Sequence, residues 1–280
     1  MVNSLIKQKV HNIIKLLENQ YHISDIITLQ EVSKALINQI KAGKLGESFW
    51  VASPGDYDLT RDQISVILLN KSTFPSGPLL DITAKIYDSF PEGSDIPVAK
   101  GDILALTTTD KEGLPYVIAS FHGDTNGLAT IPVSKALVRA IEIDEKLSKH
   151  KLIFGLDANT YENASPNQQQ DVVEWGKSYV SLGLSSCWGD APQKSNYTTY
   201  NARTYLQPQL NKACKSNEKR SKGDVNPKDF ILFTKKDFDV HKTWKDNTGL
   251  RSYIEDMAFP TLSFPSDHGI VATILEMKNN

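Results

Sequence analysis

With only two cysteines in 280 residues, the sequence has no disulfide framework of the kind that small secreted scaffolds depend on. Cys187 and Cys214 are either two free thiols or one bridge, and the sequence leaves that choice open. No apolar run approaches the roughly 18 to 20 residues that a membrane span needs. The opening MVNSLIKQKVHNIIKLLENQ carries charges throughout, which is wrong for a signal peptide. These absences do not decide the compartment, although they favour an intracellular location.

Charge of one sign is also lacking, since 31 lysine and arginine residues nearly balance 33 acidic ones. The net charge of −2 provides no global basic field, so a nucleic-acid partner would have to be held by a local patch. The composition, 40% hydrophobic and 23% charged, is that of an ordinary globular protein. The length suits one large core, and we find no internal repeat or clean linker. The sequence therefore predicts a single domain over residues 1–280.

Hydrophobic periodicity predicts a mixed α/β protein. Apolar residues at three- and four-residue spacing predict four helices, and short apolar runs predict strands between them. Apolar runs without alternation, such as LIFGL and FILF, fit strands that are buried on both faces. A long, weakly periodic loop is expected over residues 185–226. The expected helices span residues 4–20, 31–41, 131–150 and 171–183, and the expected strands span residues 25–29, 49–53, 63–70, 79–88, 101–110, 114–121, 151–157, 229–234 and 269–276.

Polar side chains stand at the ends of several of these predicted strands. A carboxylate or imidazole buried without a partner costs several kcal/mol, so such residues fit the rim of a sheet better than its core. Several strands that bring acids, an amide and imidazoles to one edge are typical of a metal-assisted hydrolytic site. The residues in question are Gln30, Glu31, His122, Asp157, Asn159, Asp229, Asp267 and His268.

The order of these residues along the chain resembles the endonuclease/exonuclease/phosphatase superfamily, which has the deoxyribonuclease I-like fold. The series consists of LQE at 29–31, the strand-end His122, LDAN at 156–159, KDFILF at 228–233 and SDH at 266–268. The resemblance implies a four-layered α/β sandwich of two packed, mostly antiparallel sheets flanked by helices. It also implies hydrolysis of a phosphate ester with a divalent cation, Mg²⁺ or Mn²⁺.

The resemblance assigns the metal to two carboxylates, Glu31 and Asp267. Magnesium prefers near-octahedral oxygen coordination and keeps several waters, so one or two carboxylates are enough to hold it. For Glu31 there is a purely structural alternative, because a glutamate at the start of a helix is favoured by the helix dipole.

The resemblance also assigns the catalytic residues. Asp157 and Asn159 match the pair that handles the attacking water and the phosphate, His268 matches the catalytic histidine, and Asp229 matches its orienting carboxylate. His122 matches a second histidine found in several branches. A carboxylate beside a histidine fixes its tautomer and stabilises its cationic form. We expect Asp157 to activate water and His268 to contact the phosphate, although the sequence alone leaves the proton acceptor open. Roles in turns, caps or structural hydrogen bonds are the alternatives for these residues.

One departure concerns the start of the chain. Family members generally open with a strand that ends in an asparagine near the metal, whereas this sequence opens with a predicted helix. We therefore expect the first family strand to be absent from this chain.

The long loop bears on the substrate. It interleaves basic residues with tyrosines, which suits a nucleic-acid strand and equally suits a solvated loop. We expect a nuclease or nucleic-acid phosphodiesterase. The alternatives are a phosphatase or phosphodiesterase acting on inositol phosphates or phospholipid headgroups, and an inactive binding module of the same fold. The sequence does not determine the oligomeric state. The loop residues are Lys194, Arg203, Lys212, Lys215, Lys219, Arg220, Lys222, Tyr197, Tyr200 and Tyr205.

Overall fold

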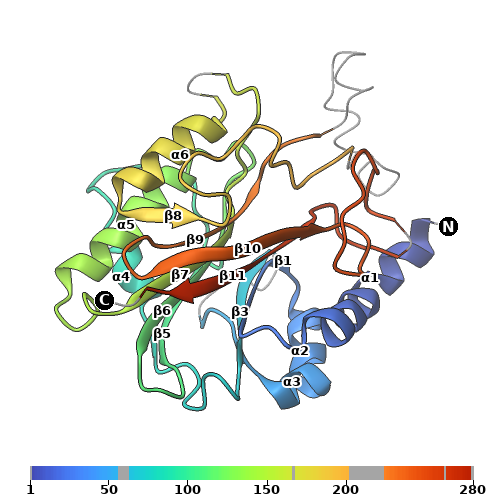
Figure 1. Ribbon diagram of the computed structural model, residues 1–280, viewed down its shortest axis with the longest axis horizontal. Helices are drawn as coiled ribbons and strands as arrows, with labels where there is room; N and C mark the ends of the chain where they lie inside the picture. The colour runs from blue at the N-terminus through green and yellow to red at the C-terminus, as the bar shows by residue number, and fades with distance from the viewer. Residues whose placement is uncertain (1, 56–62, 166–167, 202–223, 262, 279–280) are drawn as a thin grey trace.

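The computed structural model has helices on its two outer sides and β-strands between them (Figure 1). It describes residues 2–55, 63–165, 168–201, 224–261 and 263–278. In chain order the elements are α1 (Val2–Leu16), the π-helix η1 (Leu17–Tyr21), β1 (Ile26–Val32), α2 (Lys34–Ala42), α3 (Lys44–Ser48), β2 (Phe49–Ala52), β3 (Ile64–Asn70), β4 (Leu80–Asp81), α4 (Thr83–Tyr87), β5 (Ile103–Thr109), β6 (Pro115–His122), α5 (Thr130–Ile143), β7 (Lys151–Asp157), α6 (Val172–Ser181), β8 (Leu184–Ser186), β9 (Asp229–Thr234), β10 (Phe238–Asp246) and β11 (Ile270–Met277).

A six-stranded sheet forms one inner layer in the order β4-β5-β6-β7-β9-β8. Only β6 and β7 run parallel in it, and its other neighbours are antiparallel. The second inner layer contains the sheet β1-β3-β2 and the β10–β11 pair, which packs against β9 through β11. Among the described strands, β1 pairs only with β3 and β11 only with β10. The expected sandwich of mostly antiparallel sheets is confirmed. Its second layer consists of two separate sheets, which end at β1 and at β11.

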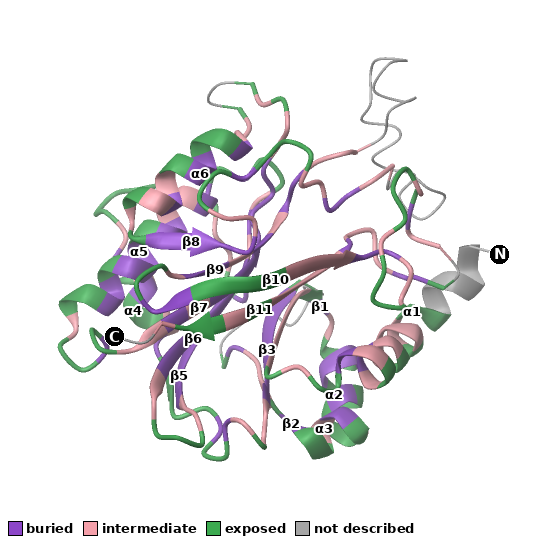
Figure 2. Cartoon of the chain, in the orientation of Figure 1, coloured by how far each residue is buried: buried purple, intermediate pink, exposed green. Residues whose placement is uncertain are grey.

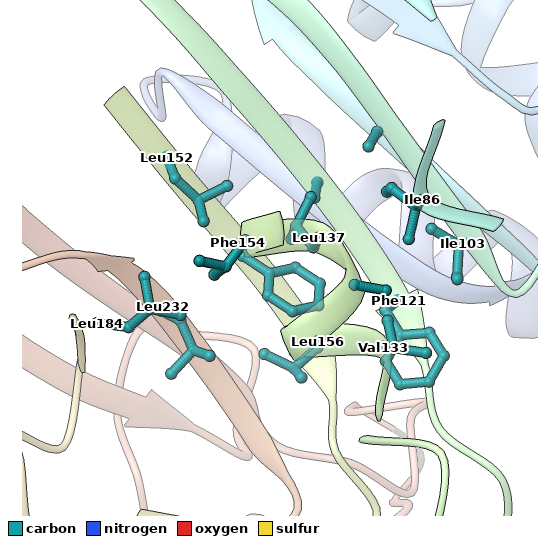
Figure 3. Packing of buried hydrophobic residues seen from close by; sticks show 14 of the residues in the cluster. Ile86, Ile103, Phe121, Val133, Leu137, Leu152, Phe154, Leu156, Leu184 and Leu232 are labelled. Atoms are coloured by element: carbon teal, nitrogen blue, oxygen red, sulfur yellow. The ribbon is translucent and has the colours of Figure 1, made fainter. Parts of the chain in front are cut away.

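Three apolar cores separate the four layers. The largest lies between the six-stranded sheet and the helices α4, α5 and α6. Figure 3 shows the centre of this core, where Phe121 and Phe154 of the sheet pack with Val133 and Leu137 of α5. All four side chains are at most 1% exposed, so this sheet face is held by burial of large apolar side chains.

Strand β3 belongs to the other two cores. Val66 and Leu68 point toward α2 and η1, whereas Ile67 and Leu69 point toward the six-stranded sheet. Each of the four is fully buried, which places β3 in the middle of the sandwich (Figure 2). Alternate side chains of a strand face opposite sides, so a strand that is covered on both sides carries a nearly continuous apolar run.

The structure differs from the expected elements at several places, among them the helix expected over residues 131–150, which ends at Ile143. The strand predicted over residues 79–88 was wrong, because Leu80–Asp81 is followed by helix α4. Ile86 of α4 and Ile82, which directly precedes the helix, face the large core four residues apart. The second helix begins later than expected, at Lys34, where Ser33 caps it through the backbone N–H of Leu36. Strand β10 was missed, because most of its side chains are polar and only its two end residues are buried.

Two further expectations concern cysteine and the membrane. Cys187 is buried and free, and Cys214 lies outside the described residues. None of the helices in the described ranges combines the length and apolar character that crossing a bilayer requires.

The two inner layers approach each other closely at Gly155 of β7. A Cβ atom at this position would lie 2.0 Å from Oγ1 of Thr28 on β1, so only glycine allows this approach. Nearby, the Gln30 side chain crosses the interface and donates to Ser120 Oγ of β6 at 3.0 Å. These contacts fix the end of β1 above the ends of β6 and β7.

Candidate active site

Three polar residues lie side by side across one edge of the six-stranded sheet. His122 ends β6, Asp157 ends β7 and Asp229 begins β9, and the pairing register aligns His122 with Asp157 and Asp157 with Asp229. The parallel strands β6 and β7 end at the same edge of the sheet, and the antiparallel strand β9 begins there. The strand topology therefore places the three side chains next to one another. The edge is the upper end of β6, β7 and β9 in Figure 1.

Glu31 reaches this edge from the opposite layer. The pairing of β1 with β3 shifts register between Leu29 and Val32, and Glu31 adopts a φ of 54° within this irregularity. Positive φ is uncommon for a residue other than glycine, and a bulge redirects the side chain that carries it. Glu31 Oε1 lies 3.5 Å from His122 Nε2, and its side chain is 51% exposed. The glutamate is therefore an open carboxylate at the mouth of the site, and it belongs to a strand rather than to a helix start.

Asp157 is the buried centre of the cluster, with 5% of its surface exposed. Its Oδ2 atom lies 3.7 Å from His122 Nε2 and 3.8 Å from His268 Nε2. Burial raises the pKa of Asp157, whereas the nearby His268 lowers it. A carboxylate between two imidazoles, with a raised pKa, is suited to accepting a proton.

His268 is held from behind by Asp229. Its Nδ1 lies 2.9 Å from Asp229 Oδ2 and 3.2 Å from Oδ1. The Thr198 hydroxyl donates to Asp229 Oδ2, so the carboxylate is itself fixed. Burial alone would lower the pKa of His268, but Asp229 and then Asp157 outweigh it and hold the pKa well above its ordinary 6.5. The two aspartates therefore favour the protonated form of the imidazole, whose Nε2 is directed toward Asp157.

Asn159 lies below Asp157 in a tight turn. It adopts a φ of 48°, and its backbone N–H donates to Asp157 Oδ1 at 2.9 Å. Its Nδ2 lies 2.9 Å from the Gly123 carbonyl and 3.3 Å from Asp157 Oδ2, and Lys228 donates to its Oδ1 at 2.9 Å. A Cβ at Gly127 would lie 2.6 Å from the Asn159 carbonyl oxygen, so glycine is needed to support this turn.

The structure brings together six of the seven residues expected at the site within one chain of contacts. Asp267 directly precedes His268. Burial lowers the pKa of His268, Asp229 and Asp157 raise it, and Asp267 raises it by a smaller amount. The metal-binding role of Asp267 stays a prediction. The six are Glu31, His122, Asp157, Asn159, Asp229 and His268.

Sequence analysis missed two residues of this cluster. Lys228 directly precedes Asp229. A lysine next to an apolar strand could have suggested a buried cation. Thr198 could not have been found, because nothing in the sequence connects it with residue 229 across the long loop. In the structure the Thr198 hydroxyl also accepts from the backbone N–H of Lys228 and of Asp229, each at 3.1 Å.

A cation-binding arrangement is present among the described residues. Asp157, Asp229 and His268 each offer a ligand atom, and these atoms lie within 4.8 Å of one another. However, His268 Nδ1 is already engaged by Asp229, which is the geometry of an oriented histidine. The more open donors are oxygens nearer the mouth, of which Glu31 is the most exposed.

Most of the basic residues of the long loop lie outside the described residues. Of those inside, Lys194 donates to Asn163 Oδ1 at 3.1 Å. Tyr197 and Tyr200 pack with ring centroids 5.8 Å apart, and their hydroxyls donate to Glu255 and Asp256. The described part of the loop thus presents an aromatic pair, while the predicted basic patch stays a prediction.

No model of a known protein family matches the sequence, and no curated protein matches it. Solved structures do match the fold. An endonuclease/exonuclease/phosphatase from Bacteroides vulgatus is 16% identical with a TM-score of 0.61, and the match covers 97% of this chain and 92% of that one.

Two further structures match over a similar length. D. rerio TDP2 complexed with a single-strand DNA product is 14% identical with a TM-score of 0.58, covering 95% of this chain and 91% of that one. A mannosyl-6-phosphatase of Bacteroides thetaiotaomicron is 16% identical with a TM-score of 0.58, covering 96% and 91%. Together with the layered architecture, these similarities show that the chain has the fold of the endonuclease/exonuclease/phosphatase superfamily.

Proposed function

We propose that this chain is a divalent-metal-dependent phosphoesterase that hydrolyses its substrate with an activated water. The observation that carries the proposal is the buried Asp157 carboxylate between His122 and His268, with Asp229 behind His268. A fold by itself supports many chemistries, so the argument rests on this site. An oriented imidazolium beside a carboxylate of raised pKa provides both a donor for a phosphate oxygen and an acceptor for a proton.

The residues at the mouth of the site suit a hard cation. The Glu31 and Asp157 carboxylates both lie within 4 Å of the same His122 nitrogen, at 3.5 Å and 3.7 Å, and carboxylate oxygens are the donors that Mg²⁺ and Mn²⁺ prefer. Glu31 would hold the cation from this mouth, and Asp267, the second ligand that the family resemblance implies, would complete the pair. When bound, it would neutralise charge that develops on the phosphate and lower the pKa of a coordinated water.

The residues of the chain itself divide the remaining work. Asp157 Oδ2 accepts the proton of the attacking water, since burial makes it a stronger base than an exposed carboxylate. His268 donates from Nε2 to a non-bridging phosphate oxygen, while Asp229 keeps its Nδ1 proton in place. The water oxygen forms the new bond to phosphorus as the bond to the leaving-group oxygen breaks, and that oxygen keeps the bonding electron pair and takes up a proton from solvent. His122 faces both Glu31 and Asp157 and orients the two carboxylates.

We favour a nucleic-acid phosphodiester as the substrate. Tyr197 and Tyr200 form a ring pair in the same segment as Thr198, whose hydroxyl donates to Asp229, and an aromatic pair in a segment that contacts the site suits stacking with a base. A structural neighbour, D. rerio TDP2, is described with a single-strand DNA product, which is consistent with this choice. A phosphate monoester is the second candidate, because another neighbour of similar TM-score is a mannosyl-6-phosphatase.

The test is a substrate panel with the purified chain. Single- and double-stranded DNA, RNA, a phosphoinositide and mannose 6-phosphate are incubated with Mg²⁺, with Mn²⁺ and with EDTA. We expect chelator-sensitive cleavage of an oligonucleotide. Release of inorganic phosphate from a monoester, with the oligonucleotides left intact, would favour the second candidate, a phosphatase. The absence of turnover on every substrate with either metal would refute the proposal and favour a binding module.

A matched control separates chemistry from general damage. His241 forms a similar histidine–carboxylate pair with Glu276, 3.0 Å apart, but both side chains are more than half exposed on the β10–β11 pair. His241→Ala should retain turnover, whereas His268→Ala should lose it. Equal losses in the two variants would contradict the assignment of His268.

A further inference from the structure

Lys228 is a buried cation that no role proposed so far accounts for. Its side chain is 9% exposed, and the ammonium lies 2.9 Å from Asn159 Oδ1, 3.4 Å from Asp224 Oδ2 and 5.2 Å from the centre of the Tyr161 ring. Burial would lower the pKa of Lys228, but Asp224 and Asp157 more than offset this and raise it above its ordinary value. A permanently charged ammonium in a site of this kind requires fixed partners.

The lysine decides the orientation of the Asn159 carboxamide. An ammonium has three donors and no acceptor, so the atom that faces it must be the amide oxygen. The Nδ2 group then points the other way, toward the Gly123 carbonyl at 2.9 Å and Asp157 Oδ2 at 3.3 Å. Both amide hydrogens are therefore used within the protein.

Asn159 thereby holds both oxygens of the Asp157 carboxylate. Its backbone N–H donates to Oδ1 at 2.9 Å, and its side-chain amide donates to Oδ2. Two donors from one residue prevent rotation of the carboxylate and keep Oδ2 directed toward His122 and His268. The side-chain half of this clamp depends on the amide orientation, and the orientation depends on Lys228.

We propose that Lys228 is a positioning residue that locks Asn159 and, through it, the Asp157 carboxylate. The proposal rests on the proposed function, since it deepens the role of the same carboxylate. The ammonium polarises the amide whose N–H faces Asp157, and hydrogen bonds in series strengthen one another. The Asn159 amide lies between Lys228 and Asp157. The lysine therefore stabilises the Asp157 carboxylate through the amide and makes no direct hydrogen bond to Oδ2, the oxygen that faces the histidines.

Steady-state kinetics of Lys228→Met test the proposal on whichever substrate of the panel is turned over. Methionine keeps the length of the side chain and removes the donor and the charge. We expect kcat to fall about 10- to 100-fold, as for partners that orient a functional group, with KM changed by less than about threefold because Lys228 does not touch the substrate. A kcat within about twofold of wild type would overturn the proposal.

Lys151→Met is the matched control. Lys151 is also a partly buried lysine of the same sheet, with an ion pair to Asp237 at 3.3 Å, but it begins β7 at the end opposite Asp157. The control should lose stability as the test variant does, while keeping its kcat. An equal loss of kcat in both variants would mean that Lys228 acts only through folding.

A double-mutant cycle distinguishes positioning through Asn159 from an independent effect. If Lys228 acts through the amide, Lys228→Met has little further effect on kcat in an Asn159→Ala background. If the two losses multiply, the proposed route from Lys228 to Asp157 is wrong.

A measurement without substrate keeps the proposal testable apart from the proposed function. In protein labelled with ¹⁵N-asparagine, the side-chain NH₂ signals of Asn159, identified by their loss in Asn159→Ala, should exchange slowly with solvent in the wild type. Lys228→Met should shift them and speed their exchange. Rapid exchange in the wild type would overturn the clamp even if the enzyme is active, whereas slow exchange without turnover on any substrate would refute the proposed function alone.

Discussion

Replacing Asp229 with asparagine removes the charge that faces His268 and keeps the size of the side chain. The two groups are 2.9 Å apart, and their side chains are 16% and 28% exposed. At an effective dielectric constant of about 20, unit charges at this separation attract by about 6 kcal/mol. Partial solvent exposure and the hydrogen bond that asparagine retains leave a net loss of about 2 to 4 kcal/mol. If this loss falls on the transition state, kcat decreases about 30- to 900-fold.

The assay is single-turnover cleavage of a labelled oligonucleotide at saturating Mg²⁺, which isolates the chemical step from product release. Glu276→Gln is the control, since Glu276 pairs with His241 at 3.0 Å but at the surface, where such pairs contribute at most about 1 kcal/mol. The control should react at the wild-type rate. A single-turnover rate for Asp229→Asn within about threefold of wild type would show that the carboxylate does not support His268 and would refute this account of the site.

Three further predictions address the site, the packing and the pH dependence. Asp157→Asn should lower kcat at least about a hundredfold, because an amide cannot accept the proton of water; steady-state rates at saturating Mg²⁺ check this. Gly155→Ala should destabilise the protein by about 1 to 3 kcal/mol in urea unfolding, because its Cβ would overlap Thr28 Oγ1, and Thr28→Ala should restore part of the loss. Burial raises the pKa of the Cys187 thiol from its ordinary 9.0 to about 12. The folded state therefore retains a proton that the unfolded state releases, so stability should fall from pH 9 toward 12 in the wild type and less so in Cys187→Ala.

Much of the fold was predictable because its information is local. The apolar runs LIFGL and FILF indicated burial on both faces, and the strands that contain them, β7 and β9, contribute to cores on both sides of the six-stranded sheet. The prediction failed at residues 79–88, where a run of apolar residues fits a strand or a helix equally well. There the packing of Ile82 and Ile86 against the large core decided for a helix.

The candidate site was predictable only in its residue types. Asp157 and His268 stand at ends of apolar strands, and an acid or imidazole in that position indicates the rim of a sheet. Their geometry was not predictable, because Lys228 and Asn159 meet across 69 residues of chain, and His268 and Asp229 across 39. Such contacts depend on strand register, which sequence periodicity does not specify.

The sequence by itself determined most of the helices and strands of a mixed α/β protein and the strand ends that carry polar groups, since side-chain periodicity and turn residues act over a few neighbouring positions. Only the tertiary structure decided that Glu31 turns outward in a bulge, that Asn159 clamps Asp157, and that Lys228 fixes the clamp. The physical reason is that a buried charge or amide is satisfied by whatever donor or acceptor the packed strands bring within about 3 Å. That partner is set by the pairing and stacking of the sheets and not by the neighbours of the residue in the chain.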